Sequence, residues 1–301
     1  MKKSYHFFTI VMISTILVSC SKENNTSQVL PQYSFVDKAT PTTSKPLING
    51  STTLDKWQLA FSDEFNDNQI DTLKWTVDKS YIRYNTDITI RSSENNVEEK
   101  NGNIYLDYNK APGVGGNLYY VGRFNSKDKY STAYGFFETK MHVVKPNGYQ
   151  TAFWMMPNSG TSMTNAGPHD GTANDGAEID IIEGNKLNTY SCGLHWDGYD
   201  VDHKGAGNGG VRATNMHDTV YHVFGLEWTN TFLKYYFNGR VVWQTSDPKA
   251  IAHVAEYILF TGMCWGVNTW VNGDVTKNTF IQNGGIDKAY IDYVRVYKFK
   301  P

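Results

Sequence analysis

Apolar and polar residues alternate along much of this chain, a pattern that predicts β-strands. Phe137, Thr139 and Met141 fall on one side of a predicted strand, while the residues between them fall on the other. Residues 192–197 alternate in the same way, and residues 258–266 form a further strand of core character. The pattern therefore predicts a protein built mainly from short strands.

Turn signals separate these strands. Asn238-Gly239 lies between two apolar runs and is the strongest hairpin signal in the chain, and Asn101-Gly102 precedes another strand. No long amphipathic helix is evident in the sequence. We therefore expect an all-β fold, a sandwich of two antiparallel β-sheets.

Three acids share one short strand with three isoleucines. Glu178 and Asp180 are two residues apart and point to the same face of the strand, whereas Glu183 is out of phase by one residue. A β-bulge around Ile181-Ile182 would return Glu183 to that face. A row of carboxylates destabilises the folded protein, because each carboxylate repels the next one and raises its pKa. We infer that function, rather than structure, requires this row.

Glycoside hydrolysis is the chemistry that uses such a row. One carboxylate attacks the anomeric carbon and a second, protonated one protonates the leaving oxygen, with retention of configuration when the two are about 5–5.5 Å apart. A middle aspartate can share a proton between them and separate their pKa values. The alternative from spacing alone is a bulged edge strand whose acids are solvated or hold a metal ion.

The motif Glu178-x-Asp180-x-x-Glu183 resembles the catalytic signature of glycoside hydrolase family 16 in its bulged form. That form is typical of laminarinases, agarases and carrageenases. The resemblance runs from about Trp57 to Tyr297. Further segments that match the family are Trp57–Asn66, Tyr134–Met141, Thr151–Pro157, Cys192–Asp197, Tyr221–Trp228 and Tyr290–Tyr297.

This resemblance implies a jelly roll of the concanavalin-like kind, with a substrate cleft across its concave sheet. It implies that Glu178 is the nucleophile, Asp180 its assistant and Glu183 the acid/base. A cleft open at both ends implies endo-action on a polymer. The substrate-binding residues implied by the resemblance are Trp154, His195, Trp196 and Trp265.

The resemblance also implies a possible structural calcium ion. In many family members the aspartate matching Asp292 binds calcium together with backbone oxygens, and Gly102 is the matching turn position here. An exposed aspartate on a last strand needs no metal, so both interpretations stay open. We expect that catalysis itself requires no cofactor.

Composition agrees with a secreted carbohydrate-active domain. The chain has 301 residues, of which 14% are aromatic and 19% charged, with a net charge of −2. The low charge and the lack of a basic run argue against nucleic-acid binding. Aromatic faces stack on sugar rings, which suits a polysaccharide partner. We expect one catalytic domain, as a monomer.

The first residues resemble an export signal. A charged start and an apolar stretch from Phe7 to Val18 end at Cys20, in a sequence that resembles a bacterial lipobox. We therefore expect a lipoprotein signal peptide over residues 1–20, with lipid on Cys20 anchoring the protein to a membrane of the cell envelope. Residues 21–51 predict a flexible linker and residues 52–301 the catalytic domain.

Two cysteines remain after Cys20. Cys192 and Cys264 both lie in predicted strands, where a small buried thiol is common. A disulfide in an oxidising compartment is the alternative. We expect free thiols.

The substrate is less well defined by the sequence. A β-1,3- or mixed-linkage β-glucan is the commonest target of the family and the first expectation. The runner-up is an endo-β-galactosidase acting on agarose-like or poly-lactosamine glycans, because Asn174-Asp175-Gly176 stands where many laminarinases have tryptophan. A sulfated galactan ranks lower, since the candidate cleft loops contain only Lys186 and Lys204 as cations. Transglycosylation would use the same intermediate.

A non-enzymatic function is the rival hypothesis. Sandwiches of this kind host many lectin-like modules, so the fold alone does not establish catalysis. A surface glycan-binding protein would have no reason to keep all of Glu178, Asp180 and Glu183. The intact acid triple therefore favours the enzyme.

Overall fold

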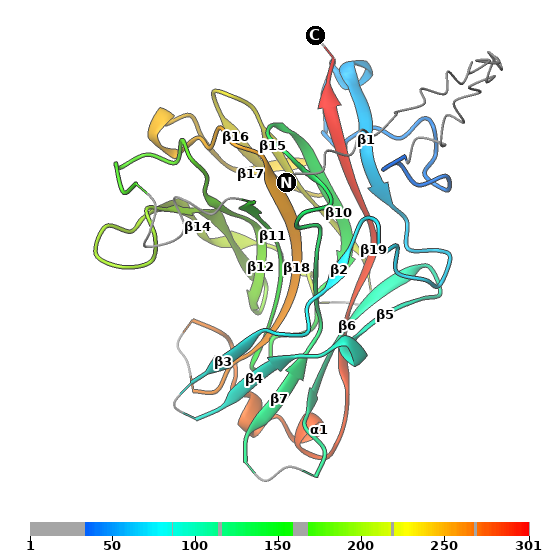
Figure 1. Ribbon diagram of the computed structural model, residues 1–301, viewed down its shortest axis with the longest axis vertical. Helices are drawn as coiled ribbons and strands as arrows, with labels where there is room; N and C mark the ends of the chain where they lie inside the picture. Colours follow the sequence, from blue (N-terminus) through cyan, green and yellow to red (C-terminus); the bar gives the residue numbers. More distant parts are fainter. Residues whose placement is uncertain are drawn as a thin grey trace, which may run out of the picture. The chain divides into compact units, whose positions relative to one another are not determined.

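Two stacked β-sheets form the framework of the described chain (Figure 1). The computed structural model describes residues 34–85, 87–113, 116–158, 168–217, 220–267 and 270–300. The predicted signal peptide of residues 1–20, with Cys20, and residues 21–33 of the predicted linker lie outside them. No helix in the described ranges has the length and apolar character needed to cross a membrane.

One sheet carries the predicted catalytic strand and is called the cleft sheet below. Its strand order is β14-β13-β12-β11-β18-β8-β2, and β9 also pairs with β18. The catalytic strand β12 is central and has antiparallel neighbours on both sides. The bounds are β2 Thr76–Val77, β8 Arg123–Asn125, β9 Ser131–Thr132, β11 Tyr149–Pro157, β12 Glu178–Lys186, β13 Thr189–Trp196, β14 Lys204–Arg212 and β18 Glu256–Cys264.

The second sheet is called the back sheet. Its order is β17-β16-β15-β10-β19-β6-β7-β4-β3, with β1 paired to β19 and β5 to β6. All of its pairs are antiparallel except that of β4 with β7. The bounds are β1 Trp57–Asp63, β3 Ile82–Tyr84, β4 Thr89–Ser92, β5 Val97–Lys100, β6 Asn103–Lys110, β7 Leu118–Val121, β10 Gly135–His142, β15 His222–Trp228, β16 Leu233–Phe237, β17 Arg240–Thr245 and β19 Asp287–Phe299.

Helices are short in the described chain. The α-helix α1 spans Thr279–Gln282. Asn278 caps its N-terminus, where the Asn278 side chain accepts a hydrogen bond from the Phe280 N–H. Four 3-10 turns span Leu54–Lys56, Glu94–Asn96, Pro248–Ala250 and Val275–Lys277. The predicted all-β, two-sheet antiparallel sandwich is therefore confirmed.

Both predicted turns close hairpins. Asn238 and Gly239 have φ of 48° and 78°, and Asn101 and Gly102 have 54° and 74°. Positive φ at both central residues is the geometry that the right-handed twist of the flanking strands favours. The register is fixed on each side, with Phe237 opposite Arg240 and Lys100 opposite Asn103.

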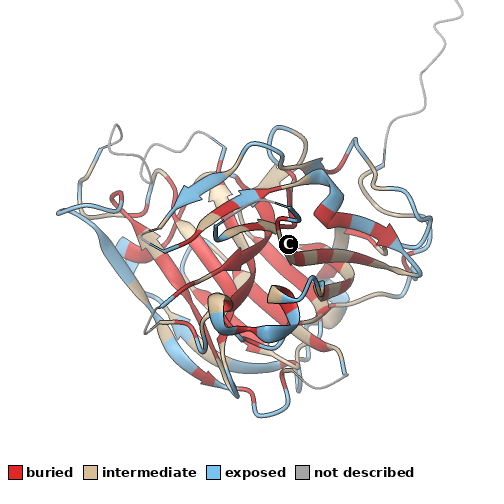
Figure 2. Ribbon diagram, turned by 90° about the horizontal axis from the view of Figure 1, so that it is seen from below, coloured by how far each residue is buried: buried red, intermediate tan, exposed pale blue. Residues whose placement is uncertain are grey.

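The core lies between the sheets, where Figure 2 shows the most deeply buried strands. Phe124, Phe260 and Phe153 form a ladder across β8, β18 and β11, with ring centroids 4.9 and 4.7 Å apart. Aromatic cross-strand pairs of this kind stabilise a sheet beyond the area they bury. The ladder lies on the core side of the cleft sheet, in β11 beside the catalytic strand and in the next two strands, and stabilises that sheet.

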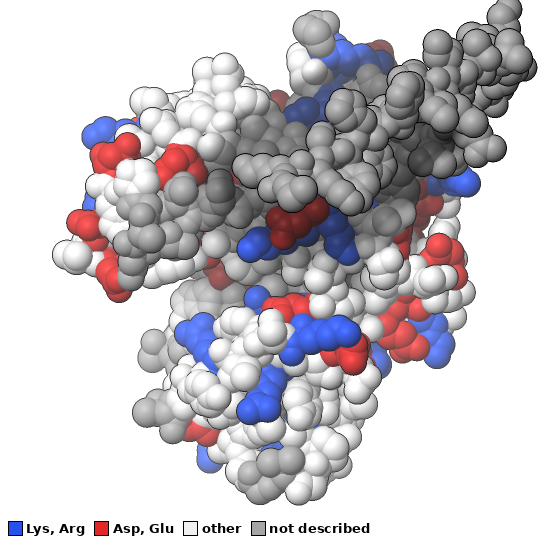
Figure 3. Space-filling model, viewed as in Figure 1, with Lys and Arg blue, Asp and Glu red and all other residues white. Residues whose placement is uncertain are grey.

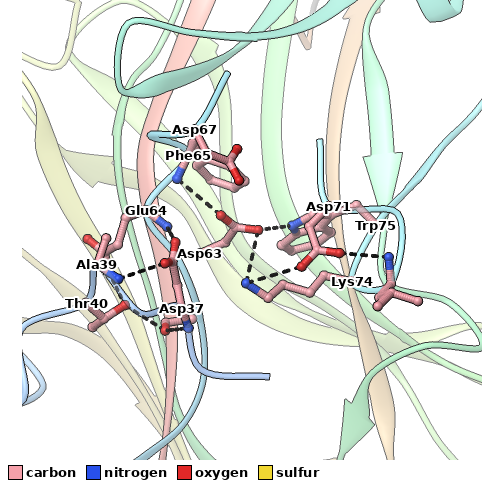
Figure 4. Close-up of polar contacts among 12 residues, drawn as sticks. Asp37, Ala39, Thr40, Asp63, Glu64, Phe65, Asp67, Asp71, Lys74 and Trp75 are labelled. Atoms are coloured by element: carbon pink, nitrogen blue, oxygen red, sulfur yellow. Dashed lines mark hydrogen bonds and ion pairs between the residues drawn. The ribbon is translucent and has the colours of Figure 1, made fainter. Parts of the chain in front are cut away.

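Residues 35–51 correct the predicted domain boundary. They were expected to be part of a linker, but the compact unit begins at Phe35. Figure 4 shows this segment meeting the end of β1: the Glu64 N–H donates to Asp37 Oδ2 at 3.0 Å, and Thr40 Oγ1 donates to Glu64 Oε1 at 2.7 Å. The segment is held by hydrogen bonds from polar residues. Its composition is therefore polar, like that of a linker, although it is part of the compact unit.

The docked segment also explains a buried acid. Glu138 in β10 is 1% exposed, and its carboxylate accepts hydrogen bonds from the Leu47 N–H at 2.7 Å and the Tyr293 hydroxyl at 2.9 Å. Burial raises the pKa of Glu138, and these two hydrogen bonds oppose the shift. Residues 35–51 thus complete the outer surface of the back sheet.

A shortened chain tests this boundary. A chain that begins at residue 52 should unfold with a free energy at least about 1–3 kcal/mol lower than one that begins at residue 34, because Glu138 loses a hydrogen-bond donor. Urea denaturation followed by tryptophan fluorescence measures the difference. Equal midpoints for the two chains would contradict the boundary at Phe35.

Candidate active site

The three acids lie on one face of β12 because of a β-bulge. Phe153 of β11 is opposite Ile182 and Trp154 is opposite Asp180, so Ile181 is the extra residue. The pairing of β12 with β13 shifts over the same stretch. Ile179, Ile181 and Ile182 are buried in the core, while Glu178, Asp180 and Glu183 line the opposite face. The predicted bulge is confirmed.

These acids lie in the floor of a cleft with two adjoining hollows of about 450 and 560 Å³. Asp180, Glu183 and Trp270 line both hollows, so the acids stand where the two meet. The first hollow is also lined by Tyr81, Arg83, Arg123, Gln150, Ala152, Trp154, Glu178, Tyr199, Thr261, Met263 and Trp265. The second is lined by β13 and the glycine-rich strand β14.

Glu178 receives a hydrogen bond from a tyrosine that the sequence did not single out. The Tyr199 hydroxyl donates to Glu178 Oε2. Burial raises the pKa of the Glu178 carboxyl, and the bond from Tyr199 opposes that shift by favouring the ionised form. Tyr199 also stacks on His203, at 6.2 Å between ring centroids. The loop after β13 thus helps to keep Glu178 charged.

Asp180 is the most deeply buried of the three acids, at 3% exposure. Burial raises its pKa well above the ordinary value, and Glu178 and Glu183 raise it further. Its Oδ2 has no hydrogen-bond partner within the described ranges, and His195 Nε2 lies 3.6 Å away. These influences all favour the protonated form of Asp180 over its charged form.

His195, which was expected to bind substrate, faces the acids. It lies opposite Glu178 on β13, and its Nδ1 is 3.0 Å from His203 Nε2. Burial, followed by the neighbouring His203, lowers the pKa of His195. The imidazole is therefore neutral near pH 7 and can accept or donate a proton at the Asp180 side.

Glu183 makes its contact on the other side of the row. Gln150 Nε2 donates to Glu183 Oε1 at 2.9 Å, and Trp265 Nε1 donates to Gln150 Oε1 at 2.9 Å. Burial raises the pKa of Glu183 to about 8, with a further contribution from the charge of Glu178. A carboxyl with this pKa is protonated at neutral pH and suits a general acid.

The predicted sugar-binding tryptophans divide into two groups. Trp154 and Trp265 line the cleft, as expected. Trp196 does not: it is 6% exposed and packs in the core. Successive residues of a strand point to opposite faces, so His195 in the cleft places Trp196 in the core. The prediction for Trp196 was wrong.

Several cleft residues were missed in the sequence. Tyr199 and His203 belong to the segment between β13 and β14, which ends beside Lys204, already a candidate cleft cation. Trp270 follows a core strand and carried no local signal. Arg83 and Arg123 come from β3 and β8, far from the motif, so only tertiary structure brings them to the cleft. Their presence overturns the expectation that Lys186 and Lys204 were the only candidate cations.

A metal ion could be held by Glu178, Asp180 and His195, whose ligand atoms lie within 4.8 Å of one another. The same atoms form the acid row, and Glu178 already accepts the Tyr199 hydrogen bond. The calcium prediction concerned Asp292 and Gly102. Asp292 is ion-paired with Lys140, and Gly102 occupies a hairpin turn. Lys140 would have to give up this ion pair for Asp292 to bind an ion, and calcium at this position stays a prediction.

The cysteines agree with the expectation of free thiols. Cys192 and Cys264 are both buried and unpaired as disulfides. Burial raises the pKa of the Cys192 thiol to about 12. Although Cys192 lines the second hollow, its thiol is therefore unreactive at neutral pH.

Comparison with known proteins places this arrangement in a family. The profile described as "Beta-porphyranase A-D, GH16 domain" matches residues 57–299. Beta-glucanase of Rhodothermus marinus is 25% identical over 268 residues, which cover 81% of this chain and 86% of that protein. Glucan endo-1,3-beta-glucosidase A1 of Niallia circulans is 24% identical over 269 residues, 80% of this chain. The chain spans less than two fifths of the length of the first curated relatives it matches.

A solved structure shares the fold. The laminarinase of Flavobacterium sp. UMI-01 superimposes with a TM-score of 0.61 over 80% of this chain and 100% of that one, at 18% identity. The bulged acid row of β12 lies within the span that the family profile covers. With that profile matching most of its length, the chain belongs to glycoside hydrolase family 16.

Proposed function

We propose that the protein is a retaining, endo-acting glycoside hydrolase that cleaves a β-linked polysaccharide. The observation that carries this proposal is the bulge in β12, which brings Glu178, Asp180 and Glu183 to one face at the floor of an open cleft. A row of buried acids destabilises a fold, so its presence indicates a function. Family membership supports the same conclusion.

The first half of the reaction uses two acids in different protonation states. Glu178, supported by the Tyr199 hydrogen bond, is ionised and attacks the anomeric carbon. Glu183, with a pKa raised to about 8, gives its proton to the leaving glycosidic oxygen. The products are a glycosyl ester on Glu178 and a free sugar hydroxyl on the released part of the chain.

The second half reverses the proton transfer. Esterification removes the charge of Glu178, which had raised the pKa of Glu183. The Glu183 carboxylate then takes a proton from water, and the resulting hydroxide attacks the anomeric carbon and frees Glu178. Asp180 holds a proton between the two glutamates and limits the negative charge of the row.

The cleft supports internal cleavage of a polymer. Two hollows meet at the acids, which gives room for sugar units on both sides of the scissile bond. Trp154 and Trp265 offer aromatic faces in the first hollow. A β-1,3- or mixed-linkage β-glucan is the first substrate class, since the relatives are a glucan endo-1,3-beta-glucosidase and a beta-glucanase. Export by the signal of residues 1–20 would bring the cleft to extracellular polysaccharide.

A second candidate is a galactan-type polymer that carries anionic groups. The specific observation is the pair Arg83 and Arg123 in the first hollow. Arg123 is buried and paired with Asp78 at 3.3 Å, while Arg83 lies over the Trp265 ring at 4.6 Å. On the face shown in Figure 3, basic and acidic groups lie interspersed and form no broad positively charged area. Attraction of an anionic polymer would therefore depend on these two arginines. The family profile, described by the name of beta-porphyranases, is compatible with this candidate.

Glutamine variants test the acid roles. Glu178→Gln should lower turnover at least about 10³-fold with little loss of binding, because glutamine cannot form the ester. Glu183→Gln should lose about 10²–10⁴-fold on polysaccharide but keep turnover on aryl glycosides whose leaving group needs no proton. Reducing-end release from laminarin, mixed-linkage glucan, agarose, carrageenan, porphyran and a mucin-type glycan measures both.

The matched control is Glu98→Gln, an exposed carboxyl in β5 of the back sheet, which should behave as the parent protein does. Full activity of Glu178→Gln would refute the mechanism. No hydrolysis of any polymer by the parent, with retained binding to one of them, would favour the lectin-like alternative.

The cost of the acid row gives a stability prediction. The folded-state pKa of Asp180 is raised, so its contribution to stability is fully present below the unfolded pKa and is lost as pH rises through the folded pKa. Asp180→Asn mimics the neutral acid. It should therefore leave stability nearly unchanged at pH 4 and raise it by at least about 1 kcal/mol at pH 8, while activity falls.

Urea denaturation at both pH values measures this effect. Asp55→Asn, an exposed carboxyl in a 3-10 turn, serves as the matched control. A loss of stability at pH 8 would show that Asp180 is held as a stabilised anion instead.

Arg83→Met separates the two substrate classes. It keeps the stem of the side chain over Trp265 but removes the charge. For an anionic galactan the KM should rise about tenfold at low salt. At high salt the difference in KM between the variant and the parent should be smaller, because salt screens the charge. For a neutral β-glucan the KM should change little. Lys204→Met, an exposed cation on β14 outside both hollows, is the control.

A further inference from the structure

We infer that Gln150 is a positioning residue that fixes which oxygen of Glu183 carries the transferable proton, and that the indole N–H of Trp265 locks the Gln150 amide in the orientation this requires. The inference rests on the proposed function and goes beyond it. It assigns to the pair a role in proton placement that is separate from sugar binding.

The strand register brings Gln150 and Glu183 together. In β11, Ala152 lies opposite Glu183, and Gln150 precedes Ala152 by two residues, which places it on the same face. Gln150 is therefore the diagonal neighbour of Glu183 on the cleft floor. It is 8% exposed, so its amide is largely shielded from water that could replace these bonds.

Hydrogen-bond chemistry then determines the orientation of the amide. The indole N–H of Trp265 can only donate, so the atom it meets 2.9 Å away must be the amide oxygen of Gln150. The amide nitrogen is thereby directed to Glu183, also at 2.9 Å. Without a donor-only partner, the two ends of a glutamine amide could be exchanged. Trp265 removes that ambiguity.

The amide in turn restricts the carboxyl. A glutamine nitrogen carries only donors, so Glu183 Oε1 must accept. When Glu183 is protonated, its proton is left to Oε2, the oxygen that must then face the leaving group. When Glu183 is ionised, the same bond stabilises the carboxylate. One contact thus serves both halves of the reaction without rotation of the carboxyl.

The Trp265 side chain is itself held in place by its neighbours. Arg83 lies over the Trp265 ring at 4.6 Å, and Trp270 meets it edge-on, with centroids 5.5 Å apart. The backbone N–H of Trp265 donates to the Gly148 carbonyl at 2.7 Å, two residues before Gln150. The indole is therefore fixed relative to the strand whose side chain it orients.

Two variants test the inference. Gln150→Leu keeps similar volume and removes the hydrogen bond to Glu183. Trp265→Phe keeps an aromatic ring for sugar but removes the N–H, so the amide can turn and present its oxygen to a protonated Glu183. Both changes favour the neutral acid, and both should move the basic limb of the kcat/KM profile upward by about one pH unit.

The control is Trp154→Phe. It removes the N–H of another cleft indole, one that donates to Thr261 Oγ1 at 3.0 Å instead of to Gln150. It should change KM and leave the basic limb in place. A purely structural or sugar-binding role of Gln150 and Trp265 would likewise change KM or stability without moving the limb.

Carboxyl ¹³C titration of protein labelled at glutamate reads the pKa of Glu183 without turnover, with Glu183→Gln assigning the signal. An upward shift in Gln150→Leu and Trp265→Phe, absent in Trp154→Phe, supports the inference even if no tested polymer is cleaved. An unshifted Glu183 titration in folded variants overturns it. A parent protein that titrates as expected but cleaves no polymer would contradict the proposed function instead.

Discussion

Three ionisable acids held close together on one buried strand are the constraint around which the structure is arranged. Glu178, Asp180 and Glu183 each have a raised pKa, with burial as the first cause. A fourth acid, Glu256, is fully buried at the start of β18 and accepts a hydrogen bond from the Ala177 N–H at 3.0 Å. It anchors the residue that immediately precedes the row. Its own pKa is raised well above the ordinary value, chiefly by burial.

Each acid is distinguished from the others by a different neighbour. Tyr199 donates to Glu178, His195 stands beside Asp180, and Gln150 donates to Glu183. These partners come from a loop, from β13 and from β11, so the strands on both sides of β12 take part. Chemically similar carboxyls can hold different protonation states only when their surroundings differ in this way. The sandwich provides the rigid frame that keeps those surroundings distinct.

The sequence carried the information that depends on local periodicity. The phase error between Asp180 and Glu183 predicted the bulge, and Asn238-Gly239 predicted a hairpin, because both follow from strand geometry. The same geometry, applied to His195 and Trp196 as neighbours, would have placed Trp196 in the core. The motif carries both residues together, but only His195 lies on the face that lines the cleft.

The remaining site residues depend on contacts between distant segments. Arg83 meets Trp265 across 182 positions of sequence, and Gln150 meets Trp265 across 115. No local pattern marks such pairs, since each residue is ordinary in its own strand. The segment from Phe35 to Ser51 shows the same limit, because it docks through hydrogen bonds to Ser62, Glu64 and Glu138 and has no apolar period.

These contacts together explain how Glu183 changes its protonation state between the two halves of the reaction. While Glu178 is charged, it raises the pKa of Glu183, and the bond from Gln150 lowers it. Esterification of Glu178 removes the first influence and leaves the second. The same glutamate therefore changes from acid to base because its neighbour loses a charge, while the amide that holds it does not move. Neither a cation nor a moving loop is needed for this change. The charge of Glu178 and the hydrogen bond from Gln150 both act from adjacent strands of one sheet.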